Sequence, residues 1–221
     1  MSHLINKEPT TEALIQEPCV YKKYIRGLNT KGGRLYCNSK CDRPRTCIVS
    51  GASVRARLIE NLTSQDVTAI QTTIDMEGQM REMVLGSIYL PYDANEPPPS
   101  KEIVSLIQYC SNNKLPLIIG CDANTHHPCW GSTDRNDRGN ALLKYLVTTD
   151  LTILNKGTKP TFMVARRQTV IDITLTSFDA ASLVTGWRVS DEESLSDHRY
   201  IKFQVRSESR MVPPWQTPRA T

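Results

Sequence analysis

The chain has 221 residues, of which 39% are hydrophobic and 23% are charged, and its formal net charge is +4. A chain of this length buries roughly 70% of its unfolded surface, which predicts one domain with a substantial core. We assign residues 1–206 to that domain, and residues 207–221, which have three prolines and no periodicity, to an extended tail or linker.

Three features argue against membrane and secreted proteins. No apolar run reaches the roughly 18 residues that a membrane span requires. Residues 1–18 have neither the basic region nor the apolar segment of a secretion signal. Seven cysteines at scattered spacings fit reduced thiols better than a disulfide framework. We therefore expect no membrane partner, and a location in the nucleus, or in the cytoplasm if the sequence is a decayed gene copy.

In the first half of the chain, short runs bounded by Gly, Asn, Asp or Pro predict strands. These runs indicate an early meander and cover residues 13–15, 34–36, 47–49, 67–74 and 83–89. A helix is predicted over residues 100–113, because Ser100 can cap it and its apolar side chains fall on one face.

In the second half, the nearly continuous apolar run over residues 115–121 predicts a strand buried on both faces. The spacing of Leu142, Leu143 and Leu146 predicts a helix over residues 139–148. Further strands are predicted over residues 151–154, 169–176, 187–190 and 200–205. The alternation of helical and strand periodicity indicates a mixed α/β fold.

Acids, amides and one histidine stand at the ends of the apolar runs, where a rigid sheet can present them to a shared cleft. These residues are Glu17, Tyr89, Asp122, Asn124, Asp172, Asp197 and His198. Such a set can hydrolyse a phosphate ester with the help of a metal ion. Glu17 and Asp197 are carboxylates of the kind that hold Mg²⁺ against a phosphate oxygen.

The remaining residues of this set can carry the proton transfers. His198 can stabilise developing charge or exchange a proton, and Asp172 can hold its imidazole in the required tautomer. Asp122 can orient or deprotonate the attacking water, while Asn124 donates to a phosphoryl oxygen. Each residue taken singly is also compatible with an ordinary turn or core position.

Basic residues are concentrated between Cys19 and Cys47, where Asp42 is the one acid. We expect nucleic-acid contacts here from Lys22, Lys23, Arg26 and Arg34. The pair Arg166 and Arg167 indicates the tip of a hairpin that contacts phosphates or a groove. For both segments the alternative is a solvated surface.

A zinc site is the weaker interpretation of two further clusters. One is Cys37, Cys41 and Cys47, and the other is Cys121, His126, His127 and Cys129. Neither has the paired spacing that zinc sites typically show.

Seven motifs in this order resemble the endonuclease/exonuclease/phosphatase superfamily, and the resemblance runs from about residue 10 to residue 205. The motifs are QEP at 16–18, SIYLPY at 87–92, GCDANTHHPCWG at 120–131, DRGNALLKYL at 137–146, LNKGTKPTF at 154–162, VIDITL at 170–175 and SDHRYI at 196–201. HHPCWG, RGNALLKYL and LNKGTKPTF are similar to the apurinic-like endonuclease domain of insect-type non-LTR retrotransposons.

The resemblance implies a four-layer α/β sandwich, in which two sheets pack face to face between helices. It implies that Glu17 binds the metal, that Asp197 lies beside it, and that Tyr89 contacts the scissile phosphate. It also implies that Asp122 and Asn124 position the water and the phosphate, and that Asp172 pairs with His198. The implied cofactor is Mg²⁺, for which Mn²⁺ can substitute. The implied reaction nicks one strand of a double-stranded DNA target and leaves a 3′-hydroxyl, which a fused reverse transcriptase extends.

One departure concerns the N-terminus. The family begins with a strand that carries an asparagine and leads through a helix into the QEP strand, whereas here residues 2–7 resemble the remainder of that helix. We therefore expect the first strand of the sandwich to be missing. Two alternative functions remain, namely a phosphoesterase that acts on a small phosphorylated substrate and a catalytically dead remnant of the domain.

Overall fold

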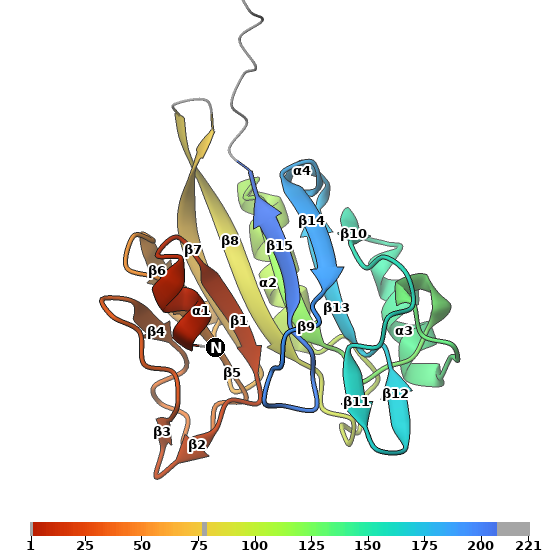
Figure 1. Ribbon diagram of the computed structural model, residues 1–221. Coiled ribbons are helices and arrows are strands. Elements are labelled where there is room, and N and C mark those ends of the chain that lie inside the picture. Colours follow the sequence, from red (N-terminus) through yellow and green to blue (C-terminus); the bar gives the residue numbers. More distant parts are fainter. Residues whose placement is uncertain (1, 77–78, 207–221) are drawn as a thin grey trace, which may run out of the picture.

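A six-stranded sheet forms the centre of the protein in this computed structural model, which describes residues 2–76 and 79–206 (Figure 1). The strands β8 and β9 run parallel, and every other neighbouring pair is antiparallel. The order across the sheet is β10 (Leu151–Ile153), β13 (Asp172–Ser177), β9 (Leu117–Asp122), β8 (Gln79–Tyr89), β7 (Val67–Met76) and β6 (Ala56–Leu58).

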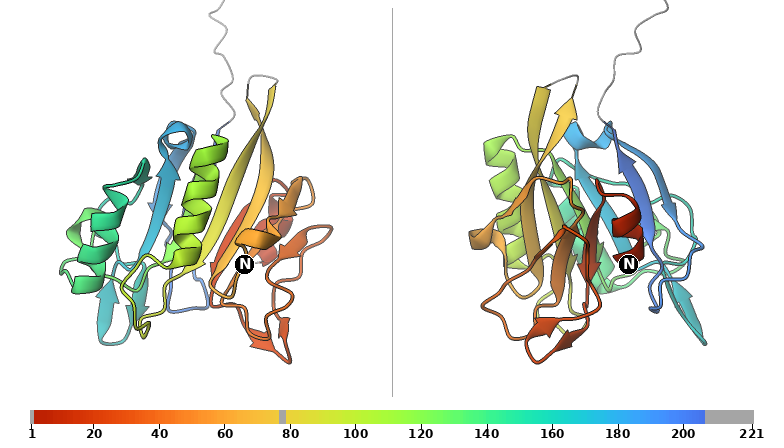
Figure 2. Two further views of the ribbon diagram at one scale, coloured as in Figure 1. Left: turned by 180° about the vertical axis from the view of Figure 1, so that it is seen from behind. Right: turned by 60° about the vertical axis from the view of Figure 1, so that its left-hand side comes forward.

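A second layer of strands packs on one face of this sheet. It contains a three-stranded sheet and a separate antiparallel pair, which lie side by side in Figures 1 and 2. The sheet is β1 (Glu12–Gln16), β5 (Thr46–Ser50) and β4 (Arg34–Tyr36), and the pair is β14 (Val184–Val189) and β15 (Ile201–Val205). The core between the layers includes the fully buried side chains of Ile48, Ile70 and Ile118.

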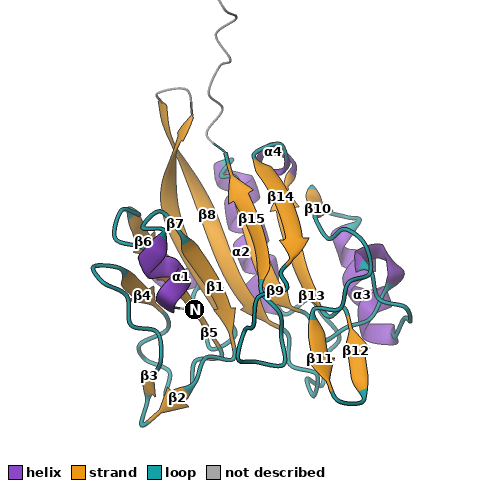
Figure 3. Ribbon diagram, in the orientation of Figure 1, coloured by secondary structure: helices purple, strands orange, loops and turns teal. Residues whose placement is uncertain are grey.

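Helices cover both outer faces of the two strand layers (Figure 3). The helices α2 (Lys101–Asn113) and α3 (Asp137–Leu146) lie on the free face of the six-stranded sheet (Figure 2). On the opposite side, α1 (Ser2–Lys7) packs on β1 and β5 through Ile5, which contacts Ala13 and Val49. The layers therefore follow the order α, β, β, α, which confirms the predicted four-layer sandwich.

Two short hairpins extend from the same end of the sandwich, at the bottom of Figure 1. One is β2 (Val20–Tyr21) with β3 (Tyr24–Ile25), and the other is β11 (Phe162–Val164) with β12 (Arg167–Thr169). The second hairpin confirms the turn predicted at Arg166, whereas the first was not predicted. The short helices α4 (Phe178–Ala181), η1 (Glu60–Leu62) and η2 (Pro128–Trp130) complete the described elements.

The element boundaries differ from the predicted ones at several places, of which two have a clear local cause. The predicted helix over residues 139–148 begins at Asp137, because the side-chain oxygen of Asn136 accepts from the amide of Gly139 and caps it. The strand predicted over residues 169–176 was wrong as one element. Residues 170–171 instead carry the chain from the β11–β12 hairpin into β13 of the central sheet. Ser100 precedes α2 as predicted, although its side chain makes no capping hydrogen bond.

Within the described residues, β1 pairs with β5 alone and β15 pairs with β14 alone. Each of them therefore has one edge that no described strand occupies, and the two strands lie in one layer (Figure 1). The expectation that the first strand of the sandwich is missing stays a prediction. The predicted tail at 207–221 lies outside the described residues. No helix in the described part of the chain is long and apolar enough to cross a membrane.

Candidate active site

The register of the central sheet places three of the predicted site residues in one row. Tyr89 of β8 is the partner of Asp122 in the parallel β8–β9 pair. Asp122 is in turn the partner of Asp172 in the antiparallel β9–β13 pair. Directly opposed residues have Cβ atoms about 4.5–5.5 Å apart, so the three side chains share one end of the sheet.

The second layer contributes the other two groups. Glu17 directly follows β1, and His198 precedes β15. The His198 segment is held by β11, because the amide of Met163 donates to the carbonyl of Asp197 over 2.7 Å and the amide of Arg199 donates to the carbonyl of Thr161. The ends of both sheets therefore converge on one site.

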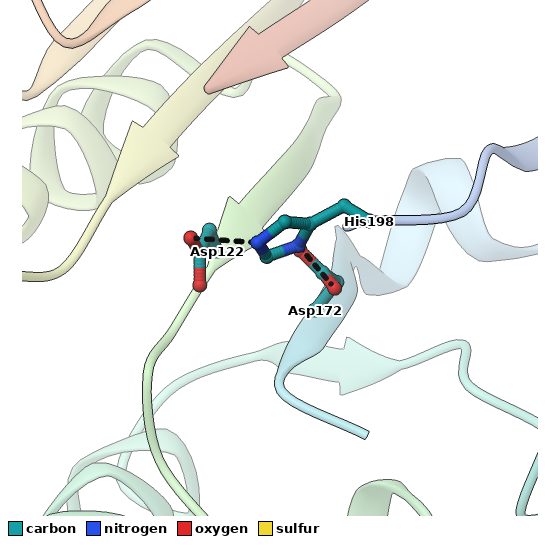
Figure 4. A group of neighbouring side chains, drawn as sticks. All are labelled: Asp122, Asp172 and His198. Atoms are coloured by element: carbon teal, nitrogen blue, oxygen red, sulfur yellow. Dashed lines mark hydrogen bonds and ion pairs between the residues drawn. The ribbon is translucent and has the colours of Figure 1, made fainter. Parts of the chain in front are cut away.

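His198 lies between the two aspartates (Figure 4). Its Nδ1 is 3.0 Å from both carboxylate oxygens of Asp172, and its Nε2 is 3.8 Å from Oδ2 of Asp122. Asp172 accepts a hydrogen bond only if Nδ1 carries the proton, which directs Nε2 toward Asp122. The site therefore holds the imidazole in one orientation between two buried carboxyl groups.

The close packing of these charges shifts their pKa values. Burial, reinforced by the nearby charge of Asp172, raises the pKa of Asp122 to about 7. Burial lowers the pKa of His198, but the hydrogen bond and the charge of Asp172, together with the charge of Asp122, outweigh it and raise this pKa to about 9. At neutral pH His198 is therefore an imidazolium.

Glu17 and Tyr89 meet at the edge of the same group. Burial raises the pKa of Tyr89, and the nearby charges of Glu17 and Asp122 add to this effect. The charge of Glu17 also acts on Asp122 and on His198. Glu17 is exposed, so its carboxylate is open to solvent beside the buried cluster.

Asn124 and Asp197 occupy less central positions. The backbone amide of Asn124 donates to Oδ1 of Asp122 over 3.3 Å, and its side-chain amide donates to the Leu90 carbonyl over 3.2 Å. Asn124 thus orients Asp122 and joins its loop to the end of β8. The side chain of Asp197 is exposed, and the carboxylate and imidazole cluster consists of Asp122, Asp172 and His198 without it. The predicted metal pairing of Glu17 with Asp197 therefore stays a prediction.

Sequence reasoning did not assign the residues that support Asp172. Oγ1 of Thr161 accepts from the amides of Ile171 and Asp172, and the side chain of Asn155 donates to the Asp172 carbonyl over 2.9 Å. The ring of Phe162 packs edge-on to His198, with ring centroids 5.0 Å apart. Thr161, Asn155 and Phe162 all lie in the LNKGTKPTF motif at 154–162. The presence of this motif was the signal in the sequence that could have identified them.

The predicted basic contacts lie mainly on the β2–β3 hairpin. Lys22 and Lys23 occupy its two-residue turn, and both have positive φ, of 49° and 68°. Lys22 and Arg26 lie near the ring of the exposed Tyr21. Lys23 forms an ion pair of 2.8 Å with Asp42 between two exposed side chains. Arg34, at the start of β4, is exposed as well.

The two arginines of the β11–β12 hairpin differ from one another. Arg166 is exposed at the turn, whereas Nη2 of Arg167 lies 2.7 Å from Nε2 of the buried His126. Nδ1 of His126 lies 3.0 Å from Oδ1 of Asp134. A neutral His126 can donate to Asp134 and accept from Arg167 at once. Arg167 therefore fastens the hairpin to the loop after β9.

The donor set at the site suits a divalent cation. The ligand atoms of Asp122, Asp172 and His198 lie within 4.8 Å of one another, and the carboxylate of Glu17 is nearby. Clustered carboxylates that raise one another's pKa are stabilised by a bound positive charge. Among the described residues, neither of the cysteine and histidine sets considered for zinc gathers its ligand atoms in this way.

Comparison with known proteins places this geometry in a family. The chain resembles the endonuclease domain of TRAS1, a telomere-specific non-LTR retrotransposon, with a TM-score of 0.77, 25% identity, and coverage of 94% of this chain and 91% of that chain. It shares its fold with the catalytic domain of Xenopus laevis APE2, with a TM-score of 0.61, 14% identity, and coverage of 92% and 87%. The AP endonuclease LMAP of Leishmania major has a TM-score of 0.63 and 12% identity, with coverage of 93% and 81%.

A comparison with curated protein sequences finds no match. A family model described as endonuclease-reverse transcriptase matches residues 83–202, a segment that contains Tyr89, Asp122, Asp172 and His198. Because this segment spans more than half of a chain whose whole fold agrees with it, the protein belongs to the endonuclease-reverse transcriptase family of the endonuclease/exonuclease/phosphatase superfamily.

Proposed function

We propose that this protein is a metal-dependent DNA endonuclease that nicks one strand of a duplex by hydrolysis of a phosphodiester bond. The observation that carries the proposal is the position of His198 between Asp122 and Asp172 at one end of the central sheet. The product in this proposal has a free 3′-hydroxyl, which a reverse transcriptase of the same polyprotein extends. The proposed place of action is the nucleus.

The proton transfers follow from the pKa values at the site. His198, an imidazolium held by Asp172, presents Nε2–H to an oxygen of the phosphate and stabilises the charge that develops there. The raised pKa of Asp122, about 7, suits a general base that accepts a proton from the attacking water. In this proposal Tyr89, the register partner of Asp122, contacts the scissile phosphate, and Asn124 orients Asp122.

Glu17 would hold the metal ion, because its carboxylate is exposed to solvent beside the buried cluster. A bound Mg²⁺ or Mn²⁺ supplies positive charge that polarises the phosphoryl oxygens. Asp197 is the exposed carboxylate that completes this set in the proposal.

The two hairpins give the proposed DNA-binding surface. They extend from the same end of the sandwich as the site, and their exposed basic side chains are Lys22, Lys23 and Arg26 on one and Arg166 on the other (Figure 1). Duplex DNA carries one negative charge per about 1.7 Å, so basic side chains spread over two hairpins can follow its backbone. Arg34 pairs with Ser50 at the end of the three-stranded sheet remote from Glu17, so its DNA contact stays a prediction outside this surface. Arg167 fixes the second hairpin.

A plasmid assay tests the reaction. Supercoiled plasmid should relax to the open-circular form with Mg²⁺ or Mn²⁺ and remain intact in excess chelator. Asp122→Asn and His198→Gln should each reduce the rate by at least about 100-fold, a typical share for a positioned acid or base. Asp179→Asn is the matched control, because Asp179 is an exposed carboxylate at the opposite end of strand β13. Nicking that persists in chelator, or full rates in both site variants, would refute the proposal.

Two further measurements separate the alternatives. A DNA polymerase should extend the nicked product without prior phosphatase treatment, because the end is a 3′-hydroxyl. A phosphoesterase that acts on small substrates would instead release phosphate from nucleoside monophosphates or phosphorylated lipid headgroups faster than it nicks plasmid. A folded protein that does neither is the catalytically dead remnant.

A further inference from the structure

Four residues interact with one another between the two sheets at the candidate site. They are Glu17 after β1, Arg45 before β5, Asp66 before β7 and Tyr89 at the end of β8. Arg45 and Asp66 belong to neither the metal-binding nor the proton-transfer set described above. Arg45 nevertheless contacts both Glu17 and Tyr89, and Asp66 contacts Tyr89.

Backbone hydrogen bonds make half of these interactions. The amide of Glu17 donates to the Arg45 carbonyl over 2.8 Å, and the amide of Arg45 donates to the Gln65 carbonyl over 2.8 Å. The amide of Tyr89 donates to the Asp66 carbonyl over 2.9 Å. The backbone of Glu17 is thus linked through residues 45 and 65–66 to the backbone of Tyr89.

The side chains make the other half. The Arg45 guanidinium donates through Nε and Nη2 to the two carboxylate oxygens of Asp66, which is a bidentate ion pair. The same guanidinium lies over the Tyr89 ring, with Cζ 5.1 Å from the ring centroid. The Tyr89 phenol lies close enough to the Glu17 carboxylate for that charge to help raise the pKa of Tyr89. The side chains of Arg45 and Asp66 are 33% and 25% exposed, so the pair is partly shielded from solvent.

Glu17 requires such support because its backbone is strained. Its φ is 49°, a left-handed conformation that is unfavourable for residues other than glycine. A strained conformation persists only when its surroundings impose it. The hydrogen bond from the Glu17 amide to the Arg45 carbonyl is a contact that does so, and the ion pair with Asp66 keeps Arg45 in place.

We propose that Arg45, oriented by Asp66, is a positioning residue that holds the Tyr89 ring and the Glu17 backbone in the geometry that phosphodiester cleavage requires. It acts through these two residues and does not itself react. A planar guanidinium is needed, because a lysine ammonium can neither form the bidentate pair nor stack flat on the ring. The inference rests on the proposed nuclease function for its kinetic test, but its structural test is independent of that function.

The structural test measures hydrogen exchange at the backbone amides of Glu17 and Tyr89. Arg45→Met keeps the length of the side chain and removes the ion pair and the stacking. It should accelerate exchange at both amides by about tenfold or more, because local opening becomes easier. The matched control is Arg57→Met, since Arg57 donates to Gln71 of the central sheet and touches no candidate site residue. Unchanged exchange at both amides in Arg45→Met would overturn the inference.

The kinetic test is a double-mutant cycle. In single-turnover plasmid nicking, Arg45→Met should lower the rate by about tenfold in the wild-type background, but by less than about threefold in the Tyr89→Phe background, where the phenol is already absent. Arg45→Lys should not restore the rate. An equal loss in both backgrounds, or full rescue by lysine, would overturn the role assigned to Arg45.

The two readouts also separate this inference from the proposed function. If the wild-type protein does not nick plasmid in any divalent metal, the nuclease proposal fails, and hydrogen exchange alone decides whether Arg45 positions Glu17 and Tyr89. If the wild-type protein nicks and the Arg45 variants behave as Arg57→Met does, the nuclease proposal stands and the positioning role fails.

Discussion

Replacement of the two lysines in the β2–β3 turn should make the protein more stable and a weaker DNA binder at the same time. Lys22 and Lys23 have φ of 49° and 68°, and they are the two central residues of the hairpin. Turns of this kind favour Asn followed by Gly, because only such residues reach positive φ at low cost. Lys22→Asn combined with Lys23→Gly therefore keeps the turn and removes two positive charges.

The magnitude follows from the contacts that the two lysines make. A left-handed conformation costs a residue other than glycine about 1–2 kcal/mol, and the substitution relieves this cost at both positions. Gly at position 23 offsets about 0.5–1 kcal/mol of that gain, because glycine has greater conformational freedom in the unfolded chain. The substitution also removes the exposed ion pair of Lys23 with Asp42 and the contact of Lys22 with the Tyr21 ring, each about 0.5 kcal/mol. The net gain expected from these terms is about 1 kcal/mol, within a range of about 0–2.5 kcal/mol, or a Tm about 2–4 °C higher.

The loss of DNA binding in this variant is measured as DNA affinity at several salt concentrations. Each lost phosphate contact should flatten the slope of log affinity against log salt by about 0.9, so the slope of the double variant should be flatter by up to about 1.8. Lys114→Gly is the control, because Lys114 also has a positive φ, of 53°, but ends α2 away from the site. The control should gain stability and keep its salt slope. An unchanged slope in the turn variant, or a lower Tm, would refute the reasoning.

Three further predictions concern stability. Burial raises the pKa of Glu12 to about 7, so ionisation should cost folding free energy as pH rises from 4.5 through 7, and Glu12→Gln should be about 1–3 kcal/mol more stable than wild type above pH 8 in urea unfolding. An equal difference at pH 4 would contradict this. The folded pKa of His198, about 9, lies above its ordinary value of 6.5, so its stabilisation is complete below pH 6.5 and is lost as pH rises through 9. The stability difference between metal-free wild type and His198→Gln should shrink over that window, and a constant difference would count against the assigned ion pairing. Finally, because β1 and β15 each have one edge that no described strand occupies, an added N-terminal strand that pairs with such an edge should raise the Tm in calorimetry. An unchanged Tm would show that these edges do not limit stability.

Local patterns determined most of the secondary structure. The apolar run before Asp122 is a strand buried on both faces, and the helix after Ser100 begins and ends close to the predicted residues. The motifs at strand ends also led to Asp122, Asp172 and His198, because side-chain chemistry and sequence order are visible without coordinates. These are properties of short segments, which nearest-neighbour patterning largely decides.

The tertiary structure decided how those segments meet. Strand register aligns Tyr89, Asp122 and Asp172 in one row, and a shift by one residue would move each side chain to the other face of the sheet. The left-handed backbone of Glu17 and its link to Arg45 arise from contacts between segments that are distant in sequence. The same is true of the bond that turns Arg167 toward His126. Such contacts depend on how whole layers pack. They cannot be predicted from local sequence patterns, because the two residues in contact are far apart in the sequence and the pattern around each one is the same with or without the contact.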